Sequence, residues 1–354
     1  MNRLIAGAVG VIVGCLVIAA AVGGFVVRQE TALSQSSGNE SETVTELEGA
    51  AGSEGVAVPY YFIAIHNEPN HVPEGRQLIE ASYLVLKEMI EKANQYNIKI
   101  TLMFTPQWAD YISESPQRMA DLESWKQQGH EIAAHHHSIY HGNWDGYTDY
   151  SEEEAMAKRV RRGGLVEPYL GTLTDYINKL KKINPKIHSG GVNDEPDKRC
   201  MPDEIIYDTC SGFANHGDPG RREGDGATPE KGKNEYVTVG TCQDIQRRWL
   251  THYQITTPDK QDAARAVFHS MDSGVYGVVA HSVQSDAEEY YKFLEFLNSK
   301  DPTGVKSRTV TEVIEQGLIP ERTISSDTLY ASPSTVFYFA EGSCRPGFDP
   351  YIDP

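Results

Sequence analysis

The sequence predicts an α/β fold, in which strands alternate with helices around a largely parallel sheet that is open or closed into a barrel. Two observations carry this prediction. Apolar runs of strand length alternate with segments of helical periodicity from residue 56 to about residue 320. Three of the apolar runs also end in a histidine, at His66, His135 and His281. Because catalytic groups collect at the carboxyl ends of parallel strands, these histidines indicate a functional site at one edge of the sheet.

The first half of the folded part contains three predicted strands. The first is VAVPYYFIAI, which ends at His66, the second covers 98–106 and stops at Pro106, and the third is HEIAAHHH. A helix with regularly spaced leucines is predicted between the first two, over 76–96. Another is predicted over 115–129, with a proline near its start and a glycine at its end.

The second half continues the alternation. Helices are predicted over SEEEAMAKRVRR and over 166–183, followed by a short strand in KIHSGGV. NEYVTVGT then reads as a strand, PDKQDAARAVFHSMDSG as a helix and VYGVVAHS as a buried strand. The helix DAEEYYKFLEFLNSK and the segment VKSRTVTEVIEQG, a predicted strand, turn and helix, complete the pattern.

Residues 4–27 form an uncharged apolar run between Arg3 and Arg28. A transmembrane helix needs about 20 such residues, whereas the apolar part of a cleaved signal peptide has roughly 7–15. We therefore expect a membrane anchor over 1–28, with a cleaved signal peptide as the second alternative and a lipidated Cys15 as the third. Each alternative places the remainder outside the cytoplasm, at the cell surface or secreted.

Composition divides the remaining chain. Residues 29–55 are rich in Ser, Glu, Thr and Gly, which predicts a disordered linker; 56–322 is the expected catalytic domain, and 323–354 a β-rich, truncated extension. The net charge of −18 argues against a nucleic-acid partner, because phosphates would be repelled. The four cysteines beyond the anchor allow disulfides, with Cys200–Cys210 as the first expected pair and Cys210–Cys242 as the alternative.

The segment GHEIAAHHHSIYH holds five of the twelve histidines. Side chains alternate along a strand, so His135 and His137 share one face and His136 points away. His141 follows four residues after His137, and a loop there lets two imidazoles meet one metal ion. The alternative is a polar strand end with solvated rings. His130 is expected to have a structural role.

Two further segments offer acid–base groups. In IHNEPN, His66 and Glu68 fall on one side of a strand end, where they can bind a metal or activate water. His281 follows an apolar strand and is a candidate general acid, or alternatively a core histidine bonded to the backbone. His188 follows the same strand-end pattern with less support.

Together these segments resemble the NodB-homology polysaccharide deacetylases. GHEIAAHHHSIYH is similar to the family's second motif, and VYGVVAHSV with the following helix is similar to its closing motif. The resemblance implies an irregular (β/α) barrel, a divalent metal ion such as zinc, and removal of acetyl groups from N-acetylated sugars. It implies that His137 and His141 bind the metal and that His281 is the acid.

The first motif differs from the family pattern. Where the family has Thr-Phe-Asp-Asp-Gly, this chain has IHNE, so we expect Glu68 to supply the metal carboxylate and His66 to act as base or ligand. Counted from GHEI, His135 instead takes the first ligand position, and it competes with His137 for that role. A glycosidase- or amidase-like hydrolase on the same scaffold, and a non-catalytic glycan-binding module, remain the alternative functions.

Overall fold

The computed structural model describes residues 58–70, 75–139, 143–161, 167–192, 202–209, 228–242 and 244–323. The predicted anchor, the linker and almost all of the C-terminal extension lie outside these residues. So do His141 and three of the four cysteines available for disulfides. Within the described part of the chain, no helix combines the length and the apolar character needed to cross a membrane.

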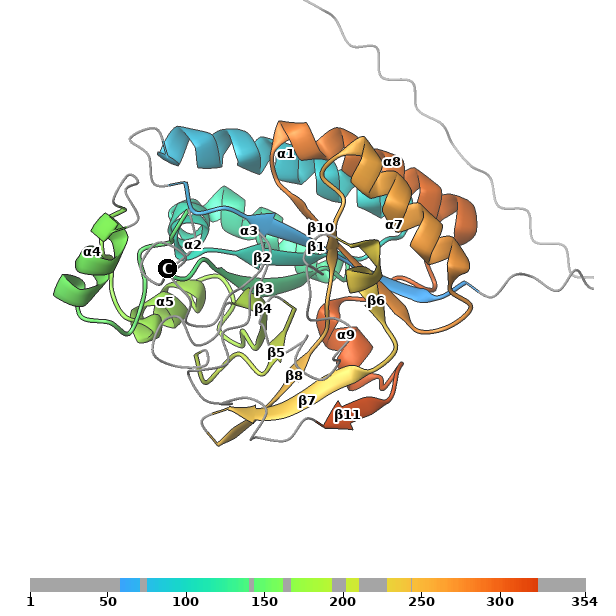
Figure 1. Cartoon of the computed structure of the whole chain (residues 1–354). Helices are drawn as coiled ribbons and strands as arrows, with labels where there is room; N and C mark the ends of the chain where they lie inside the picture. The colour runs from blue at the N-terminus through green and yellow to red at the C-terminus, as the bar shows by residue number, and fades with distance from the viewer. Residues whose placement is uncertain are drawn as a thin grey trace, which may run out of the picture. The chain divides into compact units, whose positions relative to one another are not determined.

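A single, mostly parallel sheet forms the centre of the fold, which confirms the predicted α/β class (Figure 1). Its order is β11-β7-β8-β5-β4-β3-β2-β1-β10-β6, and β9 pairs with β10. The strands are β1 (Tyr60–Asn67), β2 (Thr101–Phe104), β3 (Glu131–His136), β4 (Ser189–Val192), β5 (Tyr207–Asp208), β6 (Lys233–Asn234), β7 (Val237–Cys242), β8 (Ile245–Trp249), β9 (Tyr253–Gln254), β10 (Val275–His281) and β11 (Glu321–Thr323). Among these pairs, only β10–β6 and β7–β8 are antiparallel.

One segment of chain links the two sides of the sheet. β6 pairs with β10, and β7 pairs with β8, yet β6 and β7 are separated only by Glu235 and Tyr236. The sheet therefore curves back on itself, and the short connection from β6 to β7 links the β10 end of the strand order to the β8 end. At this place β6 contributes only two residues to the pairing with β10. The prediction left the sheet open or closed, and the structure has an irregular form between the two.

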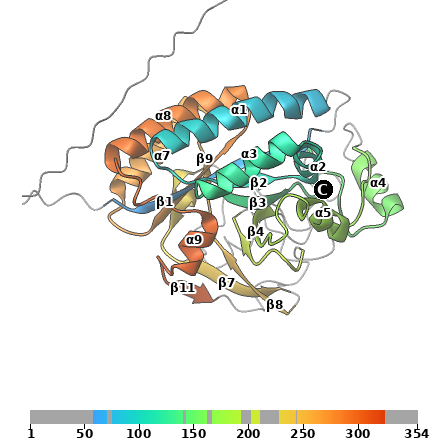
Figure 2. The same cartoon turned by 180° about the vertical axis from the view of Figure 1, so that it is seen from behind.

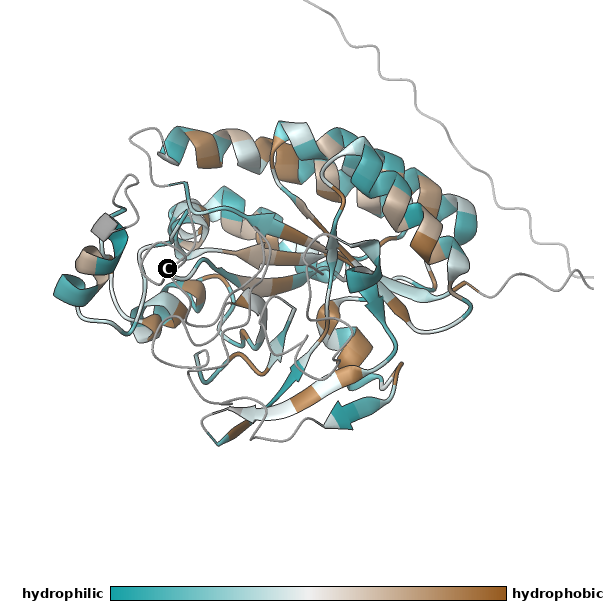
Figure 3. Cartoon of the chain, in the orientation of Figure 1, coloured by the Kyte–Doolittle hydropathy of each residue, from teal (hydrophilic) through white to brown (hydrophobic). Residues whose placement is uncertain are grey.

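Helices pack against this sheet (Figure 2). They are α1 (Gly75–Gln95), α2 (Pro106–Ser113), α3 (Pro116–Gln127), α4 (Glu152–Arg161), α5 (Leu173–Leu180), α7 (Pro258–Ser270), α8 (Gln284–Lys300), α9 (Val310–Glu315) and the 3-10 helix η3 (Pro229–Gly232). α8 packs between α1 and α7, and α2 contacts α1, α3 and α5. Figure 3 shows hydrophobic residues in the central strands and a mixture of hydrophobic and hydrophilic residues along the helices. The buried residues of α1 include Ile79, Leu86, Met89 and Ile90.

Three predicted elements need correction. The helix expected over 166–183 begins only at Leu173, because Gly171 has a φ of 148° and Thr172 caps the helix with Asp175 in a capping box. Pro106 does not only end a strand but occupies the first turn of α2, which was not predicted. Residues 305–309 form no strand beyond the single bridge of Tyr61 with Ser307.

The two faces of the sheet have different neighbours. On β1, Ile63 and Ile65 pack against the helices, whereas Phe62 and Ala64 belong to a second apolar cluster on the inner face. Side chains alternate along a strand, so His66 continues the inner face. The same alternation places His135 on the inner face with Ala133 of β3, and His281 on the inner face with Val279 of β10. Three strand ends therefore direct histidines to one side of the sheet.

Candidate metal centre

The candidate site lies at the carboxyl ends of β1, β3 and β10. β1 is central to its geometry, because it is paired with β10 on one side and with β2 on the other. His66 and His281 are register partners in the β1–β10 ladder. Glu68 follows directly after β1, and His137 directly after β3. Parallel strand direction thus brings together residues that are more than 200 positions apart in the sequence.

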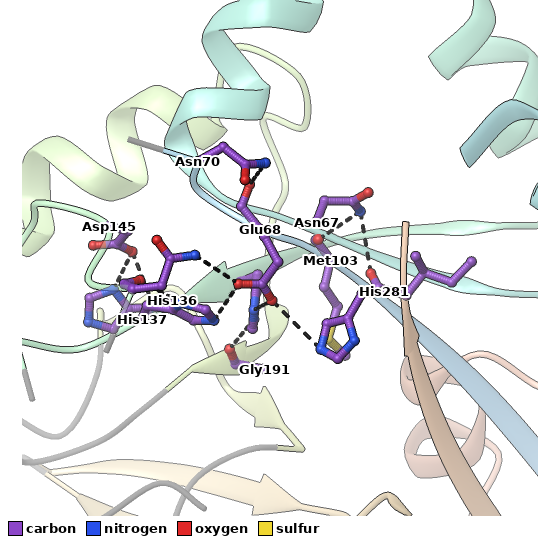
Figure 4. A network of polar contacts seen from close by, with 12 residues as sticks. Asn67, Glu68, Asn70, Met103, His136, His137, Asp145, Gly191 and His281 are labelled. Carbon is purple, nitrogen blue, oxygen red and sulfur yellow. Dashed lines mark hydrogen bonds and ion pairs between the residues drawn. The ribbon is translucent and has the colours of Figure 1, made fainter. Parts of the chain in front are cut away.

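Glu68 is the centre of the site, with histidines on both sides of its carboxylate (Figure 4). Oε2 lies 3.3 Å from Nε2 of His137. Oε1 lies 3.5 Å from Nε2 of His135 and 3.7 Å from Nε2 of His281. Nδ2 of Asn143 donates to Oε2 at 3.2 Å and holds the carboxylate in place. The side chains of Glu68 and His281 are 20% and 22% exposed, so solvent reaches the site on this side.

The same nitrogen of each histidine is turned toward Glu68, because the other nitrogen is held elsewhere. Nδ1 of His135 lies 3.0 Å from the carbonyl oxygen of Gly191, and Nδ1 of His137 lies 2.7 Å from that of Asn143. Nδ1 of His281 lies 2.7 Å from Oδ2 of Asp286. These oxygens only accept, so each Nδ1 carries the proton and, in a neutral ring, each Nε2 carries a lone pair.

This arrangement fits a metal ion. Lone pairs that converge on a carboxylate need a cation or a proton between them, and Nε2 of His135 is buried without a hydrogen-bond partner. Two ligands on a tetrahedral zinc ion lie about 3.3–3.4 Å apart when each bond is about 2.0–2.1 Å long. The distances of 3.3 and 3.5 Å from Glu68 to His137 and His135 agree with that spacing. A carboxylate with two imidazoles is also a common catalytic zinc ligand set.

The pKa shifts within the cluster also favour a bound cation. Burial opposes ionisation of Glu68, but the neighbouring His137 and His135 hold its pKa well below the ordinary value. Burial likewise opposes protonation of His137, and the Glu68 carboxylate outweighs it and raises the His137 pKa. Burial lowers the pKa of His135, against the influence of Glu68. The cluster thus keeps an anionic carboxylate that attracts positive charge from both sides.

Two more imidazoles lie behind these groups. The His66 ring packs on that of His135, with centroids 4.0 Å apart, and meets the His252 ring edge-on at 5.2 Å. Nε2 of His66 and Nδ1 of His252 are buried without a hydrogen-bond partner. Burial lowers the pKa of both rings well below the ordinary value, with smaller contributions from the neighbouring imidazoles and, for His252, from Lys231. Both rings are therefore neutral at physiological pH.

The structure brings five of the six predicted site residues together, namely Glu68, His66, His135, His137 and His281. His141 lies outside the described residues. His135 and His137 both reach Glu68, so the geometry does not choose between them for the first ligand position.

The remaining histidines have other surroundings. His136 points away, as predicted, and its Nδ1 lies 2.7 Å from Asp145. His130 bonds to the backbone of Ile100, which agrees with its expected structural role. His188 contacts Thr311 at the opposite end of β4, so it is not part of the site.

Sequence reasoning missed three contributors to the site, which are Asn143, His252 and Asp286. Asp286 lies in the first turn of α8, five residues after His281, and a test for an acidic residue near each strand-end histidine would have found it. His252 directly precedes β9, which has only two residues and therefore no detectable periodicity. Asn143 lies in the loop after β3, where nothing in the sequence signals its contact.

Comparisons with known proteins find similarity only among solved structures. No family model and no curated protein matches the chain. A protein of Mycobacterium smegmatis described as a polysaccharide deacetylase is 11% identical, with a TM-score of 0.40 over 74% of this chain and 93% of the other. The Xyl-CE4 domain of a multidomain xylanase from the hindgut metagenome of Trinervitermes trinervoides is 10% identical, with a TM-score of 0.34 over 75% and 97%. A CE4 family pseudoenzyme from Bacillus anthracis is 12% identical, with a TM-score of 0.35 over 76% and 70%.

Proposed function

We propose that the protein is a metal-dependent hydrolase that removes acetyl groups from N-acetylated glycans outside the cytoplasm. In this proposal Glu68, His135 and His137 hold one divalent ion, such as zinc, and His141 is a further ligand candidate from the sequence. The observation that carries the proposal is the convergence of Nε2 atoms from separate strands on the single carboxylate of Glu68.

The bound ion would supply a Lewis acid that polarises an amide carbonyl and makes water more acidic. The residues around it have complementary tasks. Glu68, positioned by Asn143, and the two imidazoles, fixed by backbone carbonyls, keep the ligand atoms in place. Ligand atoms that are held in place before the reaction favour catalysis, because they need no reorganisation during it.

His66 and His281 are proposed to handle the protons. Hydrolysis of the amide adds a hydroxyl group to the acetyl carbon and a proton to the departing nitrogen. His66 is neutral, as a general base must be before it accepts a proton from water. His281 is partly exposed beside the carboxylate, and Asp286 holds its Nδ1, so in the doubly protonated form of the ring Nε2 is placed to deliver its proton to the amine of the product.

The glycan substrate and the location rest on the sequence. The resemblance to NodB-homology deacetylases implies an acetylated sugar, and the apolar run at 4–27 favours a membrane-anchored or secreted protein. The negative net charge disfavours polyanionic substrates such as nucleic acids. A neutral acetylated glycan is compatible with these features.

Acetate release from N-acetylglucosamine oligomers tests the proposal. The zinc-loaded protein should release acetate, and chelation should abolish the release. His281→Ala should lower the rate by at least about a hundredfold, because a single acid–base group commonly contributes 10²–10⁴-fold. His137→Ala should also lower the rate strongly, because it removes a proposed metal ligand. His188→Ala is the matched control, since this histidine lies outside the site, and it should keep full activity.

Two other results would contradict the proposal. A folded His137→Ala protein with full activity would remove His137 from the centre. A protein that binds zinc and glycan without releasing acetate would instead favour the non-catalytic glycan-binding module.

A further inference from the structure

The carboxylate of Glu68 has imidazoles around both of its oxygens, and the proposed metal ion uses His135 and His137 but leaves His281 unused. Oε2 faces His137, while Oε1 faces both His135 and His281. Two groups of possible ligands therefore share Glu68. The first is Glu68 with His135 and His137, and the second is Glu68 with His66 and His281. Within each group the ligand atoms lie within 4.8 Å of one another.

The second group has the chemistry of a metal site of its own. His66 and His281 are register partners on neighbouring parallel strands, so their side chains leave the same face of the sheet. Asp286 fixes the Nδ1 proton of His281, which leaves the Nε2 lone pair toward Glu68. Nε2 of His66 is buried without a hydrogen-bond partner. An unpartnered polar atom at this depth is costly unless a ligand satisfies it.

We propose that His66, Glu68 and His281 form a second metal-binding position, in which Glu68 bridges two divalent ions. Imidazole-rich sites prefer zinc, copper, nickel or cobalt over magnesium and calcium, so we expect the second ion to be one of these transition metals or zinc. This inference rests on the proposed metal centre but not on the deacetylase activity.

The second position is the weaker of the two. Both ions draw on the single negative charge of Glu68, and they repel each other at close range. The first ion has two deeply buried imidazoles, His135 and His137, whereas His281 is 22% exposed to competing water. At low metal concentration the protein therefore holds one ion and at high concentration two.

Occupation of the second position has a consequence for the proposed reaction. Its ligands are His66 and His281, the proposed base and acid, and a metal ion on their lone pairs prevents proton transfer. Excess zinc is therefore expected to inhibit the enzyme, and this inhibition should be reversed by lowering free zinc to a level that still fills the first position.

Zinc binding by the full-length protein tests this inference without an activity measurement. Titration against a chromophoric zinc chelator should give two equivalents, with dissociation constants separated by roughly tenfold or more because of the repulsion between the ions. His66→Ala should bind one equivalent with the affinity of the tighter site unchanged. His137→Ala should lose the tighter site, and His188→Ala should keep both.

The results distinguish the two proposals. One equivalent in the wild-type protein at saturating zinc, or two in His66→Ala, overturns the second position and leaves the first. No zinc at all overturns both. His281→Asn provides a second variant of the weaker site in case His66→Ala fails to fold, and circular dichroism confirms folding of each variant before the titration.

Discussion

Nδ1 of His281 lies 2.7 Å from Oδ2 of Asp286, and the same oxygen accepts the backbone N–H of His281 at 3.1 Å. One carboxylate thus fixes both the ring and the strand end that carries it. The contact selects the tautomer in which Nε2 faces Glu68. Asp286 is therefore a positioning residue, since it acts on the site only through His281.

Asp286→Asn should weaken this control of His281. An asparagine side chain can donate as well as accept, so both ring tautomers become accessible. The rate constant kcat for acetate release should fall by up to about 10²–10⁴-fold, the usual range for general acid–base catalysis, with KM much less affected. In the NMR spectrum, the Nδ1 proton of His281 should no longer show the downfield shift that a strong hydrogen bond to a carboxylate gives.

The control for this variant is Glu288→Gln on the same helix, where the exposed carboxylate pairs with Lys292. It should leave both the kinetics and the proton signal unchanged. An unaltered Nδ1 signal in Asp286→Asn, together with unaltered kcat, would show that Asp286 does not position His281.

Glu68→Gln should remove the charge on which both metal positions depend. Loss of a partner that merely orients a ligand lowers metal affinity about 10–100-fold, so loss of the ligand charge itself should lower it by at least that factor. Zinc affinity measured by chelator competition gives the comparison. Glu131→Gln is the control, because Glu131 lies on β3 and bonds to Thr101 far from the cluster. Equal zinc affinity in Glu68→Gln and wild type would contradict the assignment.

The strand-end argument found most of the site because two regularities determine the result. Alternation along a strand fixes the face of each side chain, and parallel strand direction fixes the edge at which strands end. His66, His135 and His281 obey both, so their convergence follows from the pattern alone. Glu68 and His137 each lie one residue beyond a strand end, where the alternation still applies.

The parts that could not be predicted depend on contacts without periodicity. The two-residue strand β9 gives no alternation, so His252 could not be assigned to the sheet. The contact of Asn143 with Glu68 depends on how the chain turns after β3. The late start of α5 depends on the left-handed Gly171 and the capping box of Thr172, while the apolar spacing before them suggests a longer helix.

Zinc should stabilise the folded protein, because the ligands come from separate strands and are brought together only by folding. Ligand binding to the native state raises the free energy of unfolding by about 2.7 kcal/mol when the free ligand is at 100 times its Kd. Urea unfolding with zinc and with chelator measures the difference. At a zinc concentration that fills only the tighter position, the gain should be lost in His137→Ala and retained in His188→Ala, whose histidine lies outside the cluster. Equal stabilisation of both variants would indicate that zinc binds elsewhere.

His130 should make the metal-free protein less stable in acid. Burial, assisted by the charge of Lys99, lowers its pKa to about 4, and Nδ1 accepts the backbone N–H of Ile100 only in the neutral ring. The unfolded chain, with an ordinary pKa near 6.5, therefore binds more protons between about pH 6.5 and pH 4, and acidification favours unfolding. Over about 1.5 pH units below 6.5 the loss attributable to this group is about 2 kcal/mol. Urea unfolding with chelator at several pH values should show a smaller acid loss in His130→Asn than in wild type. The other buried histidines titrate equally in both proteins, so the difference isolates His130, and parallel pH curves would refute the prediction.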